Sequence, residues 1–213
     1  MKRRDFALAL GTGSLPALWT GAAQAQGAPV EGKEFTRLQP PAPVSAPAGK
    51  VEAMEFFGYW CPHCHAFEAT LDAWVRKLPA DVVFRRVPVS FGPPHEPYQK
   101  LYYALEALGQ LDAMHRKVFN AIHLQKLRLE KDSELQTLAK ENNLDFAKLK
   151  DTMGSFSVAT KCNQAKQLAN TYKLDGVPTL AVQGRFITSV GQAGSHERAL
   201  QVMDALIQQS RKA

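Results

Sequence analysis

The sequence predicts an α/β fold in which a run of helices interrupts the sheet. An apolar strand-like segment at 51–57 leads directly into an amphipathic helical stretch at 62–78. After another strand-like segment at 82–89, the pattern changes at Gly92 to successive helices. Strands return only near the end of the chain, where Gln183-Gly184 separates two short apolar segments. We therefore expect one sheet built from both ends of the chain and a helical insertion between them.

The elements follow from periodicity and from the residues that begin and end them. Strands are predicted where apolar residues cluster between turn residues, and helices where apolar residues recur every three or four positions. A cap residue or proline marks most helix starts. In chain order we expect an edge strand at 34–38, strands at 50–57 and 82–89, helices at 97–108 and 111–123, short helices from Asp132 and Asp145, a helix at 156–173, a hairpin of 180–182 with 185–188, and a last helix capped by Ser195.

The first 25 residues have the features of an export signal. A basic segment at 2–4 precedes a modestly apolar segment at 6–19, and Ala23-Gln24-Ala25 is a typical cleavage site. The apolar segment is too short and too interrupted to span a bilayer. We expect a signal peptide at 1–25, a mature protein from Gln26, and a periplasmic location, where disulfides persist.

Length and charge limit the other possibilities. A chain of 213 residues with no long biased tract fits one compact domain, or one domain with an insertion. The net charge is +6, and basic and acidic residues are interspersed through 91–167 as on a solvated helical surface. We expect a monomer that does not bind nucleic acid.

Two cysteines separated by two residues form the central motif, Cys61-Pro62-His63-Cys64. Pro62 suits the first position of a helix, which places Cys61 at the helix N-terminus. Free backbone N–H groups and the helix dipole stabilise a thiolate there, and a protonated His63 adds positive charge. The thiol pKa of Cys61 is therefore expected to be low. A low thiol pKa favours the reduced form and makes the disulfide more oxidising.

Other interpretations of the motif remain. Together with His65 it spells C-x-x-C-H, the attachment pattern of c-type haem. A metal site would need more than two thiolates, although His63 and His65 lie nearby. A purely structural disulfide across so short a loop would restrain little chain. The strand-to-helix context favours a redox dithiol over haem attachment, and the lack of a second cysteine pair argues against a metal site.

Charged residues near the motif are candidates for tuning the thiols. Glu55 interrupts the buried strand and could accept a proton or shift a thiol pKa, although a strand glutamate more often faces water. Glu68, one turn beyond Cys64, is expected on the solvent side of the helix. Arg85 and Arg86 could pair with these acids or face solvent.

The remaining cysteine and histidines are expected to have structural roles. Cys162 lies on the apolar stripe of its helix, which favours an inert, buried thiol over a reactive one. His95, His115 and His123 lack ligand spacing, so core or surface positions are the default for each, as for His196.

Two separated motifs resemble one family. The sequence resembles the thioredoxin superfamily in two places. One is Cys61-Pro62-His63-Cys64 after a buried strand, and the other is Gly176-Val177-Pro178-Thr179 before a hairpin and a last helix. The helical insertion and the export signal narrow the resemblance to the DsbA family of periplasmic thiol oxidases. This resemblance implies a thioredoxin-like fold with an inserted α-helical domain, divided into residues 26–90, 91–167 and 168–213.

The resemblance also implies a mechanism. Cys61 and Cys64 would be catalytic, and Val177, Pro178 and Thr179 would bind substrate through a cis Val177-Pro178 peptide. By this resemblance, Glu55 and Glu68 would correspond to glutamates near the active site of the family. Arg85 would correspond to a basic residue on the third strand of the family. The resemblance implies that the disulfide is the only redox group and that no cofactor is needed. In this family the membrane protein DsbB reoxidises the reduced protein.

We therefore expect a periplasmic dithiol oxidase. It would pass the Cys61–Cys64 disulfide to unfolded exported polypeptides with reduced cysteines, through a mixed disulfide at Cys61. Pro62 and His63 would tune the thiol pKa. The alternatives are an isomerase or reductase of the same fold, and a peptide-binding chaperone in which the disulfide is incidental.

Overall fold

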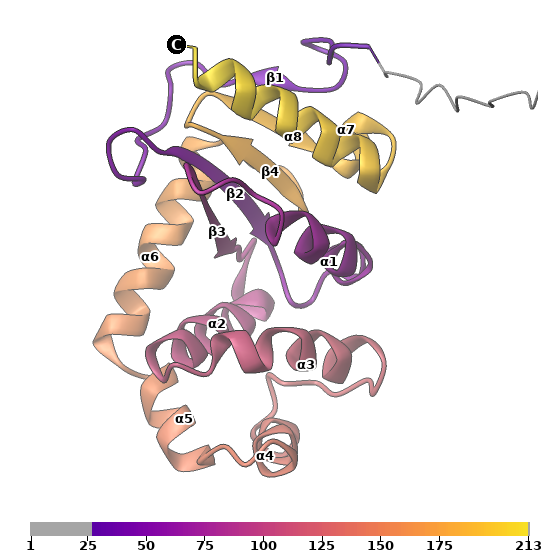
Figure 1. Ribbon diagram of the computed structural model, residues 1–213. Coiled ribbons are helices and arrows are strands. Elements are labelled where there is room, and N and C mark those ends of the chain that lie inside the picture. The colour runs from indigo at the N-terminus through magenta and orange to yellow at the C-terminus, as the bar shows by residue number, and fades with distance from the viewer. Residues whose placement is uncertain (1–26, 213) are drawn as a thin grey trace, which may run out of the picture.

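The computed structural model describes residues 27–212. The predicted signal peptide and the predicted start at Gln26 lie outside these residues. Figure 1 shows a sheet with helices against its two faces, and a group of helices packed beyond one end of it. The expected thioredoxin-like fold with a helical insertion is confirmed.

The sheet is mixed, with the order β1-β5-β4-β2-β3. Its central strand β2 (Val51–Phe57) runs parallel to β3 (Val82–Pro88) and antiparallel to β4 (Thr179–Val182). The other edge is formed by β5 (Phe186–Ser189) and the short strand β1 (Thr36–Arg37). Every residue of β2 is buried, which explains why its sequence is a nearly continuous apolar run.

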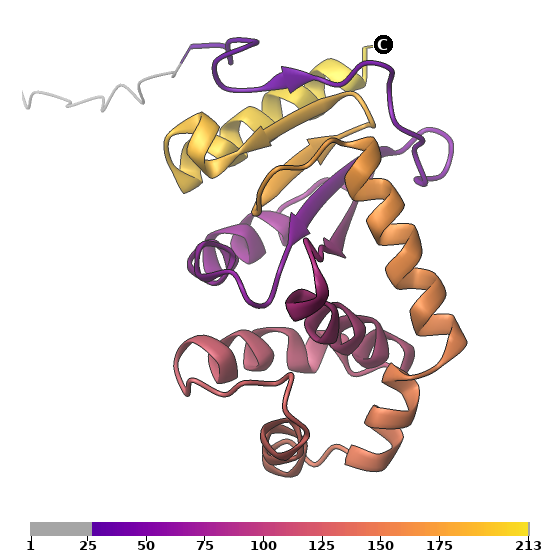
Figure 2. The same ribbon diagram turned by 180° about the vertical axis from the view of Figure 1, so that it is seen from behind.

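Helices cover both faces of the sheet. On one face, α1 (Pro62–Val75) and α8 (His196–Ser210) pack on alternate residues of β2, including Val51 and Ala53. The opposite face of β2, with Met54 and Phe56, packs against α6 (Phe156–Thr171). Figure 2 shows α6 running from the helical group back to the sheet. A single helix therefore connects the insertion to the second part of the sheet.

The helical group contains the short 3-10 helix η1 (Pro93–His95) and four further helices before α6. Their apolar faces form a core that includes Phe57 and Tyr59 from the end of β2, and both Cys61 and Cys64. The dithiol thus lies where the sheet meets the helical group. The four helices are α2 (Glu96–Ala107), α3 (Leu111–His123), α4 (Asp132–Glu141) and α5 (Phe146–Met153).

Most element predictions are confirmed within a few residues. The helix predicted at 111–123 has these bounds, and Asp145 and Ser195 cap α5 and α8 as expected. The strand predicted at 34–38 is shorter, although the Leu38 N–H still bonds the Arg185 carbonyl. The four-residue helix α7 (Val190–Ala193) was not predicted. Within residues 27–212, no helix has the length and apolarity needed to cross a membrane.

Candidate active site: the Cys61–Cys64 dithiol and its buried acids

Cys61 lies at the N-terminus of α1, as predicted. It has an extended backbone (φ −88°, ψ 118°) and is the N-cap residue, with Pro62 at the start of the helix. No side chain caps this end, so the first N–H groups of α1 are free to face the sulfur. Both cysteines are thiols and both are buried, Cys61 at 4% exposure and Cys64 at 0%, whereas Pro62 and His63 are exposed.

The two thiols differ strongly in acidity. A hydrogen bond from the Cys64 thiol is the largest of the effects that lower the pKa of Cys61 to about 6. The backbone N–H groups of Cys64 and His63 and the His63 charge act in the same direction, while burial opposes them. Burial raises the pKa of Cys64, and the bond to Cys61 raises it further. At neutral pH the pair therefore holds its negative charge on Cys61.

The second motif lies against this sulfur. The Cys61 thiol donates a hydrogen bond of 3.4 Å to the carbonyl oxygen of Val177. The Val177-Pro178 peptide is cis, as the resemblance implied. Pro178 and Thr179 are buried, and the Thr179 hydroxyl donates to the Gly176 carbonyl at 2.8 Å, which fixes the turn before β4. The structure therefore brings the two motifs together.

Both candidate glutamates are buried on the side of the sheet that α1 covers. Glu55 is 0% exposed and Glu68 is 3% exposed, so the expectation that Glu68 faces solvent was wrong. The reason is Arg86 of β3, which faces the same side of the sheet as α1. Its Nε lies 3.2 Å from Glu55 Oε2, and its Nη2 lies 2.6 Å from both Glu68 Oε1 and Asp72 Oδ1.

Arg86, and not Arg85, is the cation of this cluster. Alternate residues of a strand face opposite sides of a sheet, so the neighbouring arginines diverge. Arg85 lies 3.2 Å from Glu52, another buried glutamate of β2 on the opposite face. The arginine that pairs with Glu55 and Glu68 is therefore Arg86, whereas Arg85 pairs with Glu52.

Glu55 is the unusual acid of the cluster. Burial and the nearby charge of Glu68 raise the pKa of Glu55 to about 8, against the opposing charge of Arg86. Neither Glu55 oxygen has a hydrogen-bond partner among the described residues. The charge of an ionised Glu55 would also raise the pKa of Cys64. With its own pKa at about 8, Glu55 is mostly protonated at neutral pH.

The pKa of Glu68 is shifted in the opposite direction from that of Glu55. Burial alone would raise the pKa of Glu68, but the nearby His115 and the charge of Arg86 hold it below its usual range. Arg86 therefore contacts both acids, of which Glu68 is ionised and Glu55 is mostly protonated. Pairs of acids separated in this way can donate and accept protons in one site.

Sequence reasoning missed several residues that contact the site. His115 is buried, with Nδ1 2.8 Å from the Tyr59 hydroxyl and Nε2 3.3 Å from Glu68 Oε1. His123 Nε2 lies 2.8 Å from the Tyr59 carbonyl oxygen. His95 stacks on Trp60 with 3.9 Å between ring centroids. Their partners come from distant elements, so no spacing in the sequence could have revealed them.

The His65 side chain contacts residues of α3. Its Nε2 lies 3.1 Å from Asn120 Oδ1, and its ring stacks on His123 at 4.9 Å. Among residues 27–212, no three or more side chains of His, Cys, Asp or Glu are grouped closely enough to hold a metal ion.

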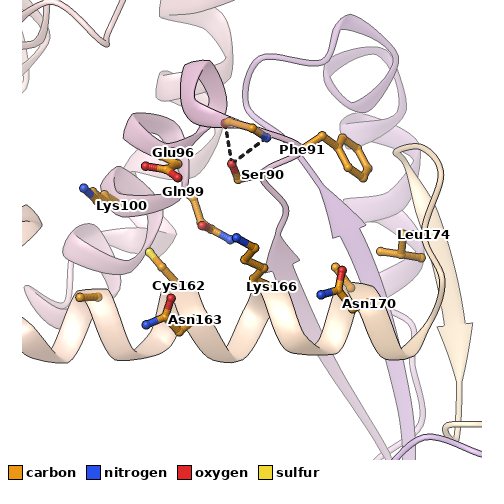
Figure 3. A pocket seen from close by; sticks show the side chains of 13 residues that line it. Ser90, Phe91, Glu96, Gln99, Lys100, Cys162, Asn163, Lys166, Asn170 and Leu174 are labelled. Carbon is orange, nitrogen blue, oxygen red and sulfur yellow. Dashed lines mark hydrogen bonds between the residues drawn. The ribbon is translucent and has the colours of Figure 1, made fainter.

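Cys162 is buried on α6, as predicted, and belongs to the same apolar core as Cys61 and Cys64. Figure 3 shows its sulfur at a pocket of about 410 Å³ between α2 and α6, with Glu96 and Lys100 on α2 and Asn163 and Lys166 on α6. Burial raises the pKa of Cys162 to about 11, although Lys100 opposes the shift. At neutral pH this thiol is protonated and a weak nucleophile.

Comparisons with known proteins agree on one family. The model of the DSBA-like thioredoxin domain matches residues 96–201. The "Thiol:disulfide interchange protein DsbA" of Burkholderia cepacia is 44% identical over 193 residues, covering 90% of this chain and 91% of the relative. The protein of the same name from Bordetella pertussis is 41% identical over the full length of both chains.

Solved structures give the same result. The crystal structure of Pseudomonas aeruginosa DsbA superimposes with a TM-score of 0.81 at 39% identity, covering 86% of this chain and 95% of that one. The structure of DsbA from Xylella fastidiosa also has a TM-score of 0.81, at 29% identity and 88% coverage of this chain.

Proposed function

Because this chain belongs to the DsbA family of thiol:disulfide interchange proteins and is a thiol:disulfide oxidoreductase, we propose that it is a periplasmic dithiol oxidase. It transfers the Cys61–Cys64 disulfide to reduced cysteine pairs of unfolded exported polypeptides. The observation that carries the proposal is the low pKa of Cys61, about 6, beside a buried Cys64. The redox group is the disulfide itself, and the reaction requires no cofactor.

The reaction proceeds by two thiol–disulfide exchanges. A client thiolate attacks the Cys61 sulfur, the Cys61–Cys64 bond breaks, and Cys64 leaves with the electron pair. A second client thiolate then attacks the client sulfur of this mixed disulfide. Cys61 leaves as a thiolate, and the client keeps the new disulfide. A low pKa makes Cys61 a good leaving group in this last step.

The same acidity sets the direction of the reaction. The charge of His63 and the N–H groups at the start of α1 stabilise the Cys61 thiolate, which exists only in the reduced protein. Each pKa unit is worth about 1.4 kcal/mol, or roughly 30 mV in a two-electron couple. The oxidised protein therefore gains free energy by oxidising a client. Pro62 supports this by beginning the helix directly after Cys61.

We propose that the segment Val177-Pro178-Thr179 binds the client. The Val177 carbonyl lies against the Cys61 sulfur and accepts a hydrogen bond from its thiol. In the oxidised protein Cys61 has no proton to donate, so this carbonyl can accept an N–H group of an extended client segment, as in strand addition. Thr179 holds the turn in place through Gly176. In reoxidation the Cys61 thiolate would attack a disulfide of a membrane reoxidant resembling DsbB.

The redox equilibrium of the purified mature protein with glutathione tests the proposal. We expect an oxidising equilibrium, with the reduced protein favoured, and rapid oxidation of a reduced, unfolded client protein. Cys64→Ala should trap mixed disulfides through Cys61. A strongly reducing equilibrium would overturn the oxidase and favour a reductase. A biological effect that survives Cys61→Ser would instead favour a peptide-binding chaperone.

A further inference from the structure

The pocket between α2 and α6 has no part in the reaction proposed above. We call it the α2–α6 pocket. Its volume is about 410 Å³, and its lining includes Phe91, Gln99 and Cys162. This volume lies within the range of cavities that hold small ligands. The side chains of the lining therefore indicate which class of ligand the pocket would hold.

A buried amide of the lining has a free hydrogen-bond acceptor. Gln99 is only 4% exposed, and its Nε2 donates to the Pro88 carbonyl oxygen at 2.8 Å. This bond fixes the amide orientation, because the Pro88 oxygen needs a donor and only the NH₂ side of the amide is one. Gln99 Oε1 therefore has no donor among residues 27–212. Two further amides, those of Asn163 and Asn170, line the pocket along α6 (Figure 3). A ligand with an N–H group would satisfy the buried oxygen.

The rim of the pocket has a net positive charge. Lys100 on α2 and Lys166 on α6 line it, and Glu96 is the only acid among the described lining residues. Burial raises the pKa of Cys162 to about 11, so its thiol is uncharged at neutral pH. Within residues 27–212, none of the three charged side chains forms an ion pair. Two lysines and one glutamate leave one positive charge, which suits a ligand with one negative charge.

One end of the pocket is apolar and held in place. Phe91, which is 45% exposed, and Leu174 lie at this end (Figure 3). The Ser90 hydroxyl donates to the Gly92 carbonyl oxygen at 2.9 Å and so fixes the loop that includes Phe91. The Phe91 ring also packs edge-on against Trp60, with 6.0 Å between ring centroids. A preformed apolar surface lowers the entropic cost of binding an apolar side chain.

We propose that the α2–α6 pocket binds the C-terminal residue of a peptide that ends in an apolar amino acid. The terminal carboxylate pairs with Lys100 and Lys166, a backbone N–H donates to Gln99 Oε1, and the last side chain packs on Phe91 and Leu174. A C-terminal residue combines these three groups. Inorganic phosphate lacks the apolar part, and an aspartate side chain has the charge without an apolar group beside it. The inference does not rest on the proposed oxidase, because binding involves no disulfide exchange.

Titration with a short peptide tests the proposal. Acetyl-Gly-Ala-Leu with a free carboxylate is added to the ¹⁵N-labelled mature protein, and the NMR signals of the Gln99 side-chain amide and the Lys100 backbone amide are followed. We expect saturable shifts of both signals. Lys100→Ala and Lys166→Ala should each weaken binding roughly threefold, the contribution of one exposed ion pair. The same peptide with a C-terminal amide should bind about tenfold more weakly, because both ion pairs are lost. Lys161→Ala is the matched control, since this lysine of α6 pairs with Glu106 and lines another pocket.

A blocking variant tests the location of the site. Ala159 is exposed on α6 and lines the pocket, so Ala159→Phe fills part of the space without changing the core. We expect this variant to fold, as judged by its NMR spectrum, and to lose binding. Equal binding of the acid and the amide, undiminished binding by Ala159→Phe, or shifts at Val177 and Thr179 in place of Gln99 would overturn the proposal. The peptide has no cysteine, so failure of the proposed oxidase would not alter any of these results.

Discussion

The Cys61 thiol donates a 3.4 Å hydrogen bond to the carbonyl oxygen of Val177, a residue 116 positions later in the chain. The contact joins the nucleophile of the first motif to the backbone of the second. It also depends on the redox state, because only a thiol can donate it. Loss of the proton, by ionisation or by disulfide formation, frees the carbonyl for another donor.

Cys64→Ala is expected to raise the pKa of Cys61. The hydrogen bond from Cys64 is the largest cause of the low value of about 6, and alanine cannot donate. We expect a rise of about one unit or more, equal to about 1.4 kcal/mol per unit, because the helix N–H groups and His63 remain. Ultraviolet absorbance of the thiolate, followed against pH, measures the midpoint. An unchanged midpoint would show that the helix N-terminus and His63 suffice.

The stability of the reduced protein should depend on the Cys61 thiolate. The pKa is about 6 in the folded protein against 9.0 for an unperturbed thiol. A lowered pKa contributes stability that is present at high pH and lost as pH falls through the folded value. We expect the reduced protein to lose its stability advantage over the oxidised protein between about pH 9 and pH 6. Urea unfolding of both forms across this range gives the result, and a constant difference would contradict it.

His63→Ala is expected to lower the reduction potential. The charge of His63 stabilises the Cys61 thiolate, so its removal favours the disulfide. A shift of roughly 30 mV corresponds to one pKa unit, measured by equilibrium with glutathione. His65→Ala is the matched control, because His65 lies two residues further along the same helix and contacts Asn120. Equal shifts in both variants would assign the effect to the helix and not to His63.

Glu55→Gln is expected to stabilise the protein at alkaline pH. The Glu55 pKa is about 8 when folded against 4.5 when exposed, so the folded protein binds the extra proton between these values. The stability contributed by the protonated group is complete below pH 4.5 and is lost as pH rises through about 8. We expect Glu55→Gln to be more stable than the wild type by about 2 kcal/mol or more at pH 9 and similar to it at pH 5.

Glu52→Gln provides the control for this measurement by urea unfolding. Glu52 is equally buried on β2 but accepts a hydrogen bond from the Ser45 N–H at 2.8 Å and pairs with Arg85. Its replacement weakens these contacts, so we expect destabilisation at both pH values. A Glu55→Gln variant that behaves in the same way would show that Glu55 is ionised in the folded protein.

Cys162→Ser is expected to leave the oxidation of clients unchanged. The thiol is buried and its pKa is about 11, so little thiolate is present at neutral pH. In a variant that lacks Cys61 and Cys64, alkylation by iodoacetamide should be slow at pH 7 and should accelerate steeply as pH rises. Rapid labelling at pH 7, or slower client oxidation by Cys162→Ser, would assign Cys162 a redox role.

The local features of the site could be predicted from the sequence. Pro62 after Cys61 defines the start of α1, and the apolar stripe that includes Cys162 predicts its burial. The contacts of Glu68 could not be predicted, because periodicity shows which residues share a helix face and not which charge lies opposite. Arg85 and Arg86 show the limit most clearly. Two arginines occupy adjacent strand positions, and a register difference of one residue would exchange their partners.

The separation of Cys61 from Val177 has a consequence during protein synthesis. Ribosomes make a chain from its N-terminus, so both motif cysteines emerge well before the segment that covers the nucleophile. Until α6 has folded and returned the chain to the sheet, Cys61 has no carbonyl beside it. A nascent chain therefore has a dithiol that lacks its natural neighbours. A disulfide of another molecule can exchange with this dithiol until Val177 lies against Cys61.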